Sequence, residues 1–367
     1  MVQIAVIVVA LLAPALLGVA VWGSRRQQRG LALMQAHVLD SPLLVVIPAR
    51  NEEDRIGATL DQLLKDPSPH LRFVVVDDRS TDRTAEIVRR RDDPRLQLLA
   101  ITTDPPPGTF GKPRALAAAV AAHTDTDLIA VVDADVVVTP GLFGALVRAR
   151  RETGADAISG LPRLLNHTFE EHLLVPAFVA AVAISHPPAA VNAGRCAFLN
   201  GQLFVVRRSA LADVGGFDAV GRTVLEDVAL ARLLHTQGKK LLIVDASGLA
   251  STRMYSSLAQ IIEGFGKNAR AIHGVKLVPL GLLLASTAWL PWLSVGAALV
   301  TTGAADDVGA GLALAACIAL MMINRHALKS PMWLAIFSPL AQTVVAAVFV
   351  RAALVRRGSW RGRTFST

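Results

Sequence analysis

Short, continuously apolar runs alternate with helix-like segments between residues 43 and 133. LLVVIP begins at Leu43, FVVVD at Phe73, LQLLAI at Leu96 and LIAVVD at Leu128. Runs of this length are typical of strands that are buried on both faces. Because segments with apolar residues at helical spacing separate them, the pattern predicts an α/β fold with a parallel sheet and helices on both of its faces.

Polar clusters follow the first, second and fourth of these runs. They are PARNE at residues 48–52, DDRS at residues 77–80 and DAD at residues 133–135. The carboxyl ends of parallel strands meet at one edge of a sheet, and ligands bind outside that edge. We therefore expect the clusters to form a single ligand-binding edge.

Asp133 and Asp135 are candidate metal ligands. Alternate carboxylates on an extended segment can face one hard cation, which shares its coordination shell with waters and substrate phosphates. Two acids in a surface turn are the alternative interpretation, and a D-x-D pair alone is a weak signal. Its place among the other clusters favours the metal site.

The cluster after the second run has two parts. Asp77 and Asp78 stand at the strand end, where they can hydrogen-bond a nucleotide base or ribose. Ser80, Thr81 and Asp82 are typical N-cap residues, and we expect them to begin the next helix.

Lys112 ends the stretch GTFGK and precedes an alanine-rich helix expected at residues 113–123. Glycines and a helix start suit contact with a diphosphate. The alternative is a flexible loop with a solvated lysine. Because Pro113 follows Lys112, the ending of a P-loop is absent, which argues against a P-loop ATPase.

Two later stretches carry further candidates. Glu226 and Asp227 open a helix, where one acid stabilises the helix N-terminus and the other can serve as a general base. Spacing alone does not choose between them. Asn200-Gly201-Gln202 precedes an apolar strand, and its glycine suits either close approach of a ligand or a bulge or turn.

In this order and spacing, PARNE, DDRST, GK before an alanine-rich helix, DAD, NGQ and ED resemble the family 2 inverting glycosyltransferases. The resemblance covers residues 43–274 and implies the GT-A fold, a Rossmann-like nucleotide-diphospho-sugar transferase domain. It also implies a nucleotide-diphospho-sugar donor, usually a UDP-sugar, and a divalent cation, Mg²⁺ or Mn²⁺. The implied reaction is a single displacement at the anomeric carbon.

The resemblance also implies roles for individual residues. Asp135 would reach the metal and diphosphate, with Asp133 nearer the donor sugar, and Asp227 rather than Glu226 would be the base. Donor binding falls on Pro48, Ala49, Asn51, Glu52, Asp77, Asp78, Lys112, Asp133 and Asp135. Candidates for acceptor or diphosphate contact are Gly201, Gln202, Arg253 and Lys267.

The chain departs from the processive synthases of this family, because the Q-x-x-R-W motif is absent between residues 251 and 274. Instead RMY, GFGKN and a late WRGR resemble the transferases linked to carotenoid and hopanoid pathways. That similarity implies single transfer to a lipid or isoprenoid acceptor with a hydroxyl or carboxyl group. A polysaccharide or glycan synthase, and a non-catalytic membrane protein that binds a nucleotide-sugar, are the alternatives.

Hydrophobic residues make up 53% of the chain and gather at its two ends. Val2–Trp22 is long enough to cross a bilayer and lacks the basic start of a signal peptide. Basic residues directly after it place the next domain in the cytoplasm by the positive-inside rule. Leu277–Thr302, Val308–Asn324 and Met332–Val355 are candidate late membrane segments, which predict two or three crossings.

These observations predict a multi-pass protein of the cell (inner) membrane with a cytoplasmic catalytic domain. Leu173–Ile184 is expected within the soluble domain, either lining acceptor access or as a buried core helix. The expected parts are a transmembrane helix (1–23), a basic linker (24–42), the GT-A domain (43–250), an interfacial helix region (251–275), membrane segments (276–356) and a basic tail (357–367).

The net charge of +8 raises the question of a nucleic-acid partner. Much of the excess flanks the membrane segments, where anionic headgroups explain it. Aromatics are only 5% of the chain, too few for base-stacking platforms, so no nucleic acid is expected. With only Cys196 and Cys317, a disulfide framework is excluded as well.

Overall fold

The structure is a computed structural model that describes residues 34–274, 277–298, 314–315, 318–319, 321–322, 325–326, 330–354, 357–360 and 363–366. Two compact units divide the chain. We call the described residues of Gly30–Leu165 and Pro188–Met254 the α/β unit, and those of Asn166–Pro187 and Tyr255–Thr367 the helical unit.

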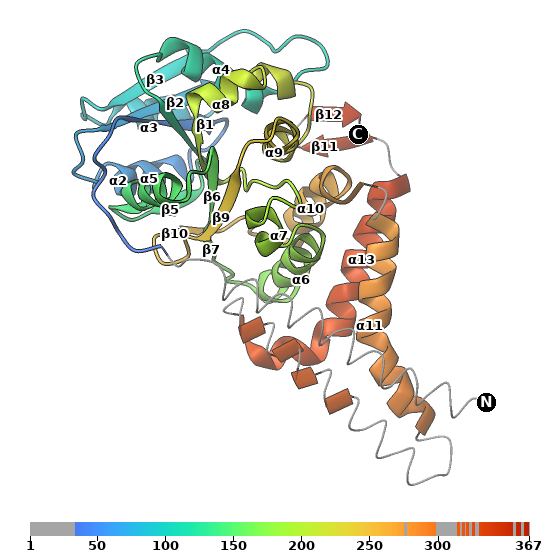
Figure 1. Ribbon diagram of the computed structural model, residues 1–367. Helices are drawn as coiled ribbons and strands as arrows, with labels where there is room; N and C mark the ends of the chain where they lie inside the picture. Colours follow the sequence, from blue (N-terminus) through green and yellow to red (C-terminus); the bar gives the residue numbers. More distant parts are fainter. Residues whose placement is uncertain are drawn as a thin grey trace. The chain divides into compact units, whose positions relative to one another are not determined.

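The α/β unit contains a seven-stranded sheet in the order β3-β2-β1-β4-β8-β6-β9 (Figure 1). Its strands are β1 (Leu43–Ala49), β2 (Leu71–Asp78), β3 (Leu96–Ile101), β4 (Leu128–Val132), β6 (Ala157–Leu161), β8 (Leu203–Arg207) and β9 (Leu241–Asp245). Strand β8 runs antiparallel to both β4 and β6, and the other pairings are parallel. The expected α/β fold is confirmed, and the four strands predicted between residues 43 and 133 pair in parallel, while β8 adds an antiparallel strand to the sheet.

The reversed direction of β8 has a consequence for the ligand edge. Leu203, the first residue of β8, pairs with Val132, the last residue of β4. The segment that leads into β8 therefore reaches the same edge of the sheet as the residues that follow β4.

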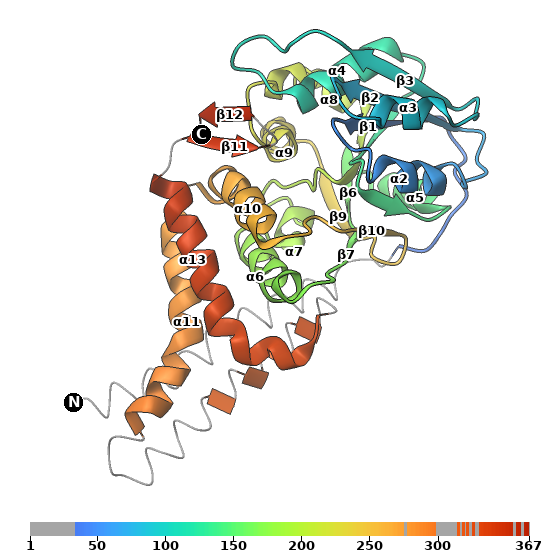
Figure 2. The same ribbon diagram turned by 180° about the vertical axis from the view of Figure 1, so that it is seen from behind.

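Helices cover both faces of this sheet, and a small sheet lies beside it (Figures 1 and 2). The helices are α2 (Ile56–Leu63), α3 (Thr84–Arg89), α4 (Gly111–Ala122), α5 (Leu142–Thr153), α7 (Pro188–Asn192), α8 (Arg208–Asp213), α9 (Glu226–Thr236) and the 3-10 helix η1 (Asp218–Val220). The small sheet has the order β5 (Val136–Val138), β10 (Ala250–Thr252) and β7 (Arg163–Leu164).

Alternate side chains of β1 enter separate cores. Val45 and Ile47 pack with residues of α2 and α5, whereas Leu44 and Val46 pack with residues of α4, α8 and α9. Each is fully buried, which stabilises the fold by about 1.5–3 kcal/mol per side chain. Burial on both faces explains why the strand is apolar throughout.

The helical unit gathers segments that are far apart in the sequence. It contains α6 (Phe169–Ser185), α10 (Leu258–His273), α11 (Leu277–Ala298), the 3-10 helix η3 (Met332–Phe337), α13 (Ser338–Leu354) and a hairpin of β11 (Arg357–Trp360) and β12 (Arg363–Ser366). Helices α11 and α13 run side by side in both views (Figures 1 and 2). The ring of Phe178 stacks on Phe265 at 4.2 Å and lies 6.1 Å from Phe349, which joins α6, α10 and α13.

Among the described residues, Phe169–Asn192 and Met332–Leu354 are long and apolar enough to cross a membrane. A third candidate is the pair Leu258–His273 and Leu277–Ser286, which meet at 115°. Met332–Leu354 agrees with the predicted last segment. Val2–Trp22 and most of Val308–Asn324 lie outside the described residues.

Helix α6, which carries Leu173–Ile184, groups with the helical unit and not with the α/β unit. The predicted extent of the GT-A domain, residues 43–250, stays a prediction. The buried residues of α6 include Leu173, Val175 and Phe178, and its partners are the late helices α10 and α13. Contacts this distant in sequence leave no trace in the local pattern.

Candidate functional site

The backbone fixes the DAD segment at the end of β4. The Asp133 amide donates to the carbonyl of Gln202 at 3.0 Å, and the Val136 amide donates to the carbonyl of Asp133 at 3.0 Å. The Thr59 hydroxyl donates to the carbonyl of Ala134 at 2.8 Å. The acidic segment and the segment before β8 are thus joined at one edge.

Lys112 links this edge to helix α9. Its Nζ lies 2.6 Å from Oδ1 of Asp133 and 2.8 Å from Oε1 of Glu226. It also donates to the carbonyl of Gly201 at 3.4 Å. The interpretation as a solvated loop lysine is wrong, because Lys112 lies in the first turn of α4 and is ion-paired.

The surroundings keep Lys112 charged. Burial disfavours the ammonium, but the nearby carboxylates of Asp133, Glu226 and Asp227 outweigh it and raise the pKa of Lys112 above its usual value. Lys112 therefore supplies a permanent positive charge among these acids.

Asp227 is held by two backbone amides. Gly201 N donates to its Oδ2 at 2.7 Å and Val228 N donates to its Oδ1 at 2.8 Å. A Cβ on Gly201 would lie 2.5 Å from Oδ2, closer than non-bonded atoms approach. Gly201 is therefore needed for its close approach to the Asp227 carboxylate.

The protein environment makes Asp227 a weaker acid than usual. Burial and the charge of Glu226 raise its pKa, while Lys112 and the two amides lower it, with a net value of about 7. A carboxylate with a pKa near the working pH is suited to general base catalysis.

Asp135 has a buried oxygen without a partner. Its Oδ1 lacks any hydrogen bond, and its Oδ2 lies 3.6 Å from the guanidinium of Arg55. Burial, together with Asp133 and Glu52, raises the pKa of Asp135 to about 7 against the opposing charges of Arg55 and Lys112. An unsatisfied buried carboxylate oxygen is costly, and a bound cation would satisfy it.

The acids at this edge fit a cation that is shared with phosphates. Among the described residues, no group of three or more His, Cys, Asp or Glu side chains is placed to hold a metal ion by itself. Mg²⁺ is usually held by one or two carboxylates together with substrate phosphates and water. Asp133 and Asp135 match that donor set.

Sequence reasoning missed Arg55, which stands just before α2 and neutralises Asp135. A signal was present, because a cation at a helix N-terminus is electrostatically unfavourable and so needs another reason to be there. The carboxylate at the end of β4 supplies that reason.

Hydrogen bonds join the loops that follow β1 and β2. Asn51 N donates to the hydroxyl of Ser80 at 3.0 Å, and Thr81 N donates to Oδ1 of Asn51 at 2.8 Å. Asn51 and Arg79 both have left-handed backbones, with φ of 52° and 57°. Non-glycine residues rarely adopt this conformation, and such strain gathers at functional sites.

These hydrogen bonds between the loops correct the predicted start of helix α3. Ser80 and Thr81 bond to the loop after β1 and do not cap the helix. Helix α3 instead begins at Thr84, whose amide donates to Oδ1 of Asp82 at 3.0 Å. The N-cap prediction is therefore wrong for Ser80 and Thr81. The N-cap residue is Arg83, and the Asp82 side chain just before it accepts from the Thr84 amide.

Asp77 and Asp78 are buried and have protein partners. Asp77 accepts from Ser80 N at 3.1 Å. Asp78 accepts from Nε of Arg79 at 2.8 Å and lies 3.8 Å from the guanidinium of Arg50. They shape the loop, and their contact with a nucleotide stays a prediction.

The other predicted residues occupy several places. Pro48 and Ala49 end β1, and the amide of Glu52 donates to the hydroxyl of Thr84 at 2.8 Å. Arg253 directly follows β10 in the α/β unit, whereas Lys267 lies in α10 of the helical unit. The edge therefore brings together Lys112, Asp133, Gly201, Gln202, Glu226 and Asp227. Glu52 is close enough for its charge to raise the pKa of Asp135.

Residues 41–263 match the model of the glycosyltransferase like family 2. The chain belongs to this family. The match includes every acid of the strand-end edge and the start of α10, in agreement with the resemblance seen in the sequence.

Individual relatives agree. A probable glycosyltransferase, YdaM of Bacillus subtilis, is 30% identical over 53% of this chain and 46% of its own length. The 4,4'-diaponeurosporenoate glycosyltransferase of Staphylococcus aureus is 25% identical over 68% of this chain and 66% of its own length. The match thus spans about half to two thirds of these relatives.

A solved structure shares the fold. The mannosyltransferase PcManGT of Pyrobaculum calidifontis, in complex with GDP-Man and Mn²⁺, superposes with a TM-score of 0.57 and 20% identity, over 95% of this chain and 99% of its own. At that identity the likeness shows the GT-A fold, which confirms the predicted fold class.

Proposed function

We propose that the protein is a membrane-anchored inverting glycosyltransferase. It transfers one sugar from a nucleotide-diphospho-sugar to the hydroxyl of a lipid or isoprenoid acceptor. The observation that carries the proposal is the pair of contacts made by Lys112, at 2.6 Å from Asp133 and 2.8 Å from Glu226. These contacts join the candidate donor residues and the candidate base in one cluster.

Asp227 is proposed as the base that accepts the acceptor's proton. As the proton moves to Asp227, the acceptor oxygen forms a bond to the anomeric carbon. The bond from that carbon to the diphosphate oxygen breaks, and the nucleoside diphosphate leaves with the electron pair. Two amides orient the carboxylate, which fixes the direction of proton transfer.

Glu226 is assigned a different role from Asp227. Its carboxylate is paired with Lys112 and buried, with an exposed fraction of 5%. Its charge raises the pKa of the neighbouring Asp227. We assign Glu226 to position Lys112 and to tune the base, so that the two acids that spacing left open take different roles in the proposal.

Asp133 and Asp135 would hold the divalent cation. A bound Mg²⁺ or Mn²⁺ supplies positive charge to the diphosphate as it leaves. The orphaned Oδ1 of Asp135 supports this assignment, and Lys112 adds a second positive charge at the same edge. That the PcManGT complex contains Mn²⁺ and a nucleotide-sugar supports the same donor chemistry.

Two observations support the acceptor class. Helices of membrane-spanning length and composition belong to the same chain as the site. The S. aureus relative is, by its name, a transferase to diaponeurosporenoate. A hydroxyl acceptor has a proton for the base to remove, whereas a carboxylic acid, the acceptor type in the relative's name, is already ionised at neutral pH and needs no base.

Transfer in lipid nanodiscs tests this proposal. The purified protein is given a panel of labelled nucleotide-sugars, Mg²⁺ or Mn²⁺, and a total lipid extract. We expect one donor to yield a single labelled lipid, dependent on metal. A ladder of products would replace single transfer with glycan synthesis, and consumption of no donor would contradict the catalytic proposal.

A further inference from the structure

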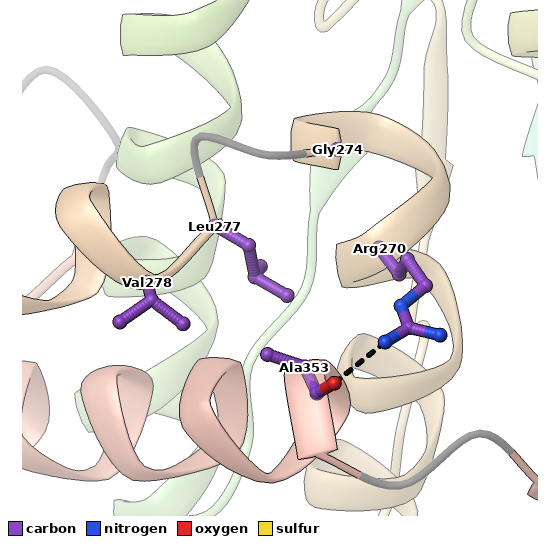
Figure 3. Close-up of a pocket in the computed structure, with 5 residues that line it drawn as sticks. All are labelled: Arg270, Gly274, Leu277, Val278 and Ala353. Carbon is purple, nitrogen blue, oxygen red and sulfur yellow. Dashed lines mark hydrogen bonds between the residues drawn. The ribbon is translucent and has the colours of Figure 1, made fainter.

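A cavity of about 390 Å³ lies within the helical unit, where α10 ends, α11 begins and α13 ends. It is lined by Arg270, Gly274, Leu277, Val278 and Ala353. Figure 3 shows the aliphatic side chains of Leu277 and Val278 on the α11 side and the Arg270 guanidinium at the end of α13. The lining is thus apolar on one side and cationic on the other.

The corner that shapes this cavity is formed at Gly274. Helix α10 ends there with a left-handed backbone, φ 55°, and a Cβ on Gly274 would meet no atom within 4 Å. The axes of Leu258–His273 and Leu277–Ser286 differ by 115°. The corner therefore leaves space that neither helix fills.

The two helices that meet at this corner differ in polarity. Helix α10 buries Ile261, Phe265 and Ala269 and carries Arg270 in its last turn. Helix α11 has no charged residue along its 22 positions. A helix with one apolar face followed by a wholly apolar helix is the pattern of a chain that passes from the membrane surface into the bilayer. We therefore expect Gly274 and Leu277, on either side of the corner, to lie near the lipid headgroups.

Arg270 is suited to an oxyanion. Its guanidinium carries five N–H donors in a planar fork and stays charged at all physiological pH values. One donates to the carbonyl of Ala353 at 2.6 Å (Figure 3). That contact stabilises the last turn of α13.

We propose that this cavity binds the anionic headgroup of an acidic membrane amphiphile. The guanidinium of Arg270 pairs with the phosphate or carboxylate oxygens, and the walls formed by Leu277, Val278 and Ala353 contact the first methylenes of the chain. The volume lies within the range of about 300–1,000 Å³ that is usual for small-molecule sites. This site is separate from the sugar-transfer cluster and does not depend on its function.

Native mass spectrometry of the full chain measures the binding directly. The protein in neutral detergent is titrated with phosphatidylglycerol, and the occupancy of the first bound lipid is recorded. Arg270→Met removes the charge, and Ala353→Leu fills the apolar wall while keeping the charge. Arg351→Met removes an exposed arginine that lies two residues before Ala353 on α13 and serves as a matched control.

We expect Arg270→Met and Ala353→Leu each to weaken the tightest site by about tenfold or more, the size of a charge-assisted contact, and Arg351→Met to leave it within about twofold. Arg270→Lys, which keeps the charge but loses the fork, should fall between. Unchanged occupancy in both Arg270→Met and Ala353→Leu would overturn the proposal. Folding of each variant is checked by whether it retains the wild-type charge-state distribution. Ala353→Leu tests the site if Arg270→Met fails to fold.

Competition distinguishes the sources of the oxyanion. Oleate, a carboxylate amphiphile, should displace phosphatidylglycerol, whereas inorganic phosphate at millimolar concentration should not. Displacement by phosphate alone would show that the site takes a free anion and would overturn the assignment to an amphiphile. Equal retention of the zwitterionic phosphatidylcholine would overturn it too.

Discussion

Asp227 illustrates how two short contacts set the chemistry of one side chain. Gly201 and Val228 hold its oxygens through amides, and the absence of a Cβ at Gly201 allows the 2.7 Å contact. At the scale of single residues, the function therefore depends on a backbone position as much as on the carboxylate itself.

Replacement of Gly201 by alanine tests this dependence. The added Cβ would stand 2.5 Å from Oδ2 of Asp227, so either the carboxylate or the segment before β8 must move. We expect kcat to fall by about 100-fold, within the range for loss of a general base, with the donor Kd changed by less than about threefold. Gly266→Ala serves as a comparison, because the nearest atom to a Cβ there lies at 3.6 Å, an ordinary van der Waals contact, and its backbone has no positive φ. Equal kcat values for Gly201→Ala and the wild type would contradict the assignment.

The pH dependence of kcat/KM provides a second test at this scale. Asp227 must be ionised to accept a proton, and its pKa is raised to about 7. Activity should therefore be low under acidic conditions and rise as the pH increases through 7. Because Asp135 titrates in the same range, Glu226→Gln is needed for assignment.

Removal of the Glu226 charge lowers the pKa of Asp227. In Glu226→Gln, the rise of kcat/KM on the acidic side of the pH profile, the acidic limb, should therefore move to lower pH. Glu152→Gln, an exposed acid paired with Arg148 on α5, should leave the limb in place. A limb that stays at the wild-type pH in Glu226→Gln would assign the titration to another group.

At the scale of elements, the loops after β1 and β2 work as one structure. Asn51 joins them through its side chain and its own amide while it occupies a left-handed backbone. Asparagine tolerates this conformation better than alanine does, and glycine adopts it without strain.

The comparison of Asn51→Gly with Asn51→Ala separates backbone from side chain. Both lose the hydrogen bond to Thr81, but only alanine adds backbone strain. We expect the donor Kd, measured by calorimetry with metal present, to increase for both and more for Asn51→Ala. An unchanged Kd in both variants would mean that these loops do not bind the donor.

The strands of the ligand edge could be predicted because their signal is local. β1, β2 and β4 are apolar runs closed by polar residues, and burial on both faces requires that composition. The direction of β8 could not be predicted in this way, since Leu203–Arg207 has the same apolar composition whether it runs parallel or antiparallel to β4. The contacts of Lys112 depend on that direction, so they could not be predicted from the sequence either.

At the scale of the whole molecule, the helical unit interrupts the α/β unit in sequence. Asn166–Pro187 lies between the two segments of the α/β unit, and α6 within it packs on α10 and α13 through Phe178. The sequence pattern showed that α6 is apolar but not which helices it meets, because those helices lie far along the chain.

This arrangement predicts how truncation would behave. A chain restricted to residues 34–254 lacks both predicted terminal membrane regions but keeps α6, whose partners α10 and α13 are removed. We expect it to remain in the membrane or aggregate, as measured by fractionation and size-exclusion chromatography. The same chain with polar residues at Leu174, Phe178 and Ala181 should become more soluble. A monomeric, soluble product with the natural sequence would contradict the partnership of α6 with the late helices.

The central claim is that the cluster of Lys112, Asp133, Glu226 and Asp227 transfers a sugar with Asp227 as the base. The most direct measurement compares donor binding and single-turnover transfer in the same preparations of wild type, Asp227→Asn and Asp218→Asn, in which an exposed acid is changed as a control. We predict that Asp227→Asn binds the donor within about threefold of wild type but transfers at least about 100-fold more slowly, while Asp218→Asn behaves as wild type. Transfer at the wild-type rate by Asp227→Asn would contradict the account.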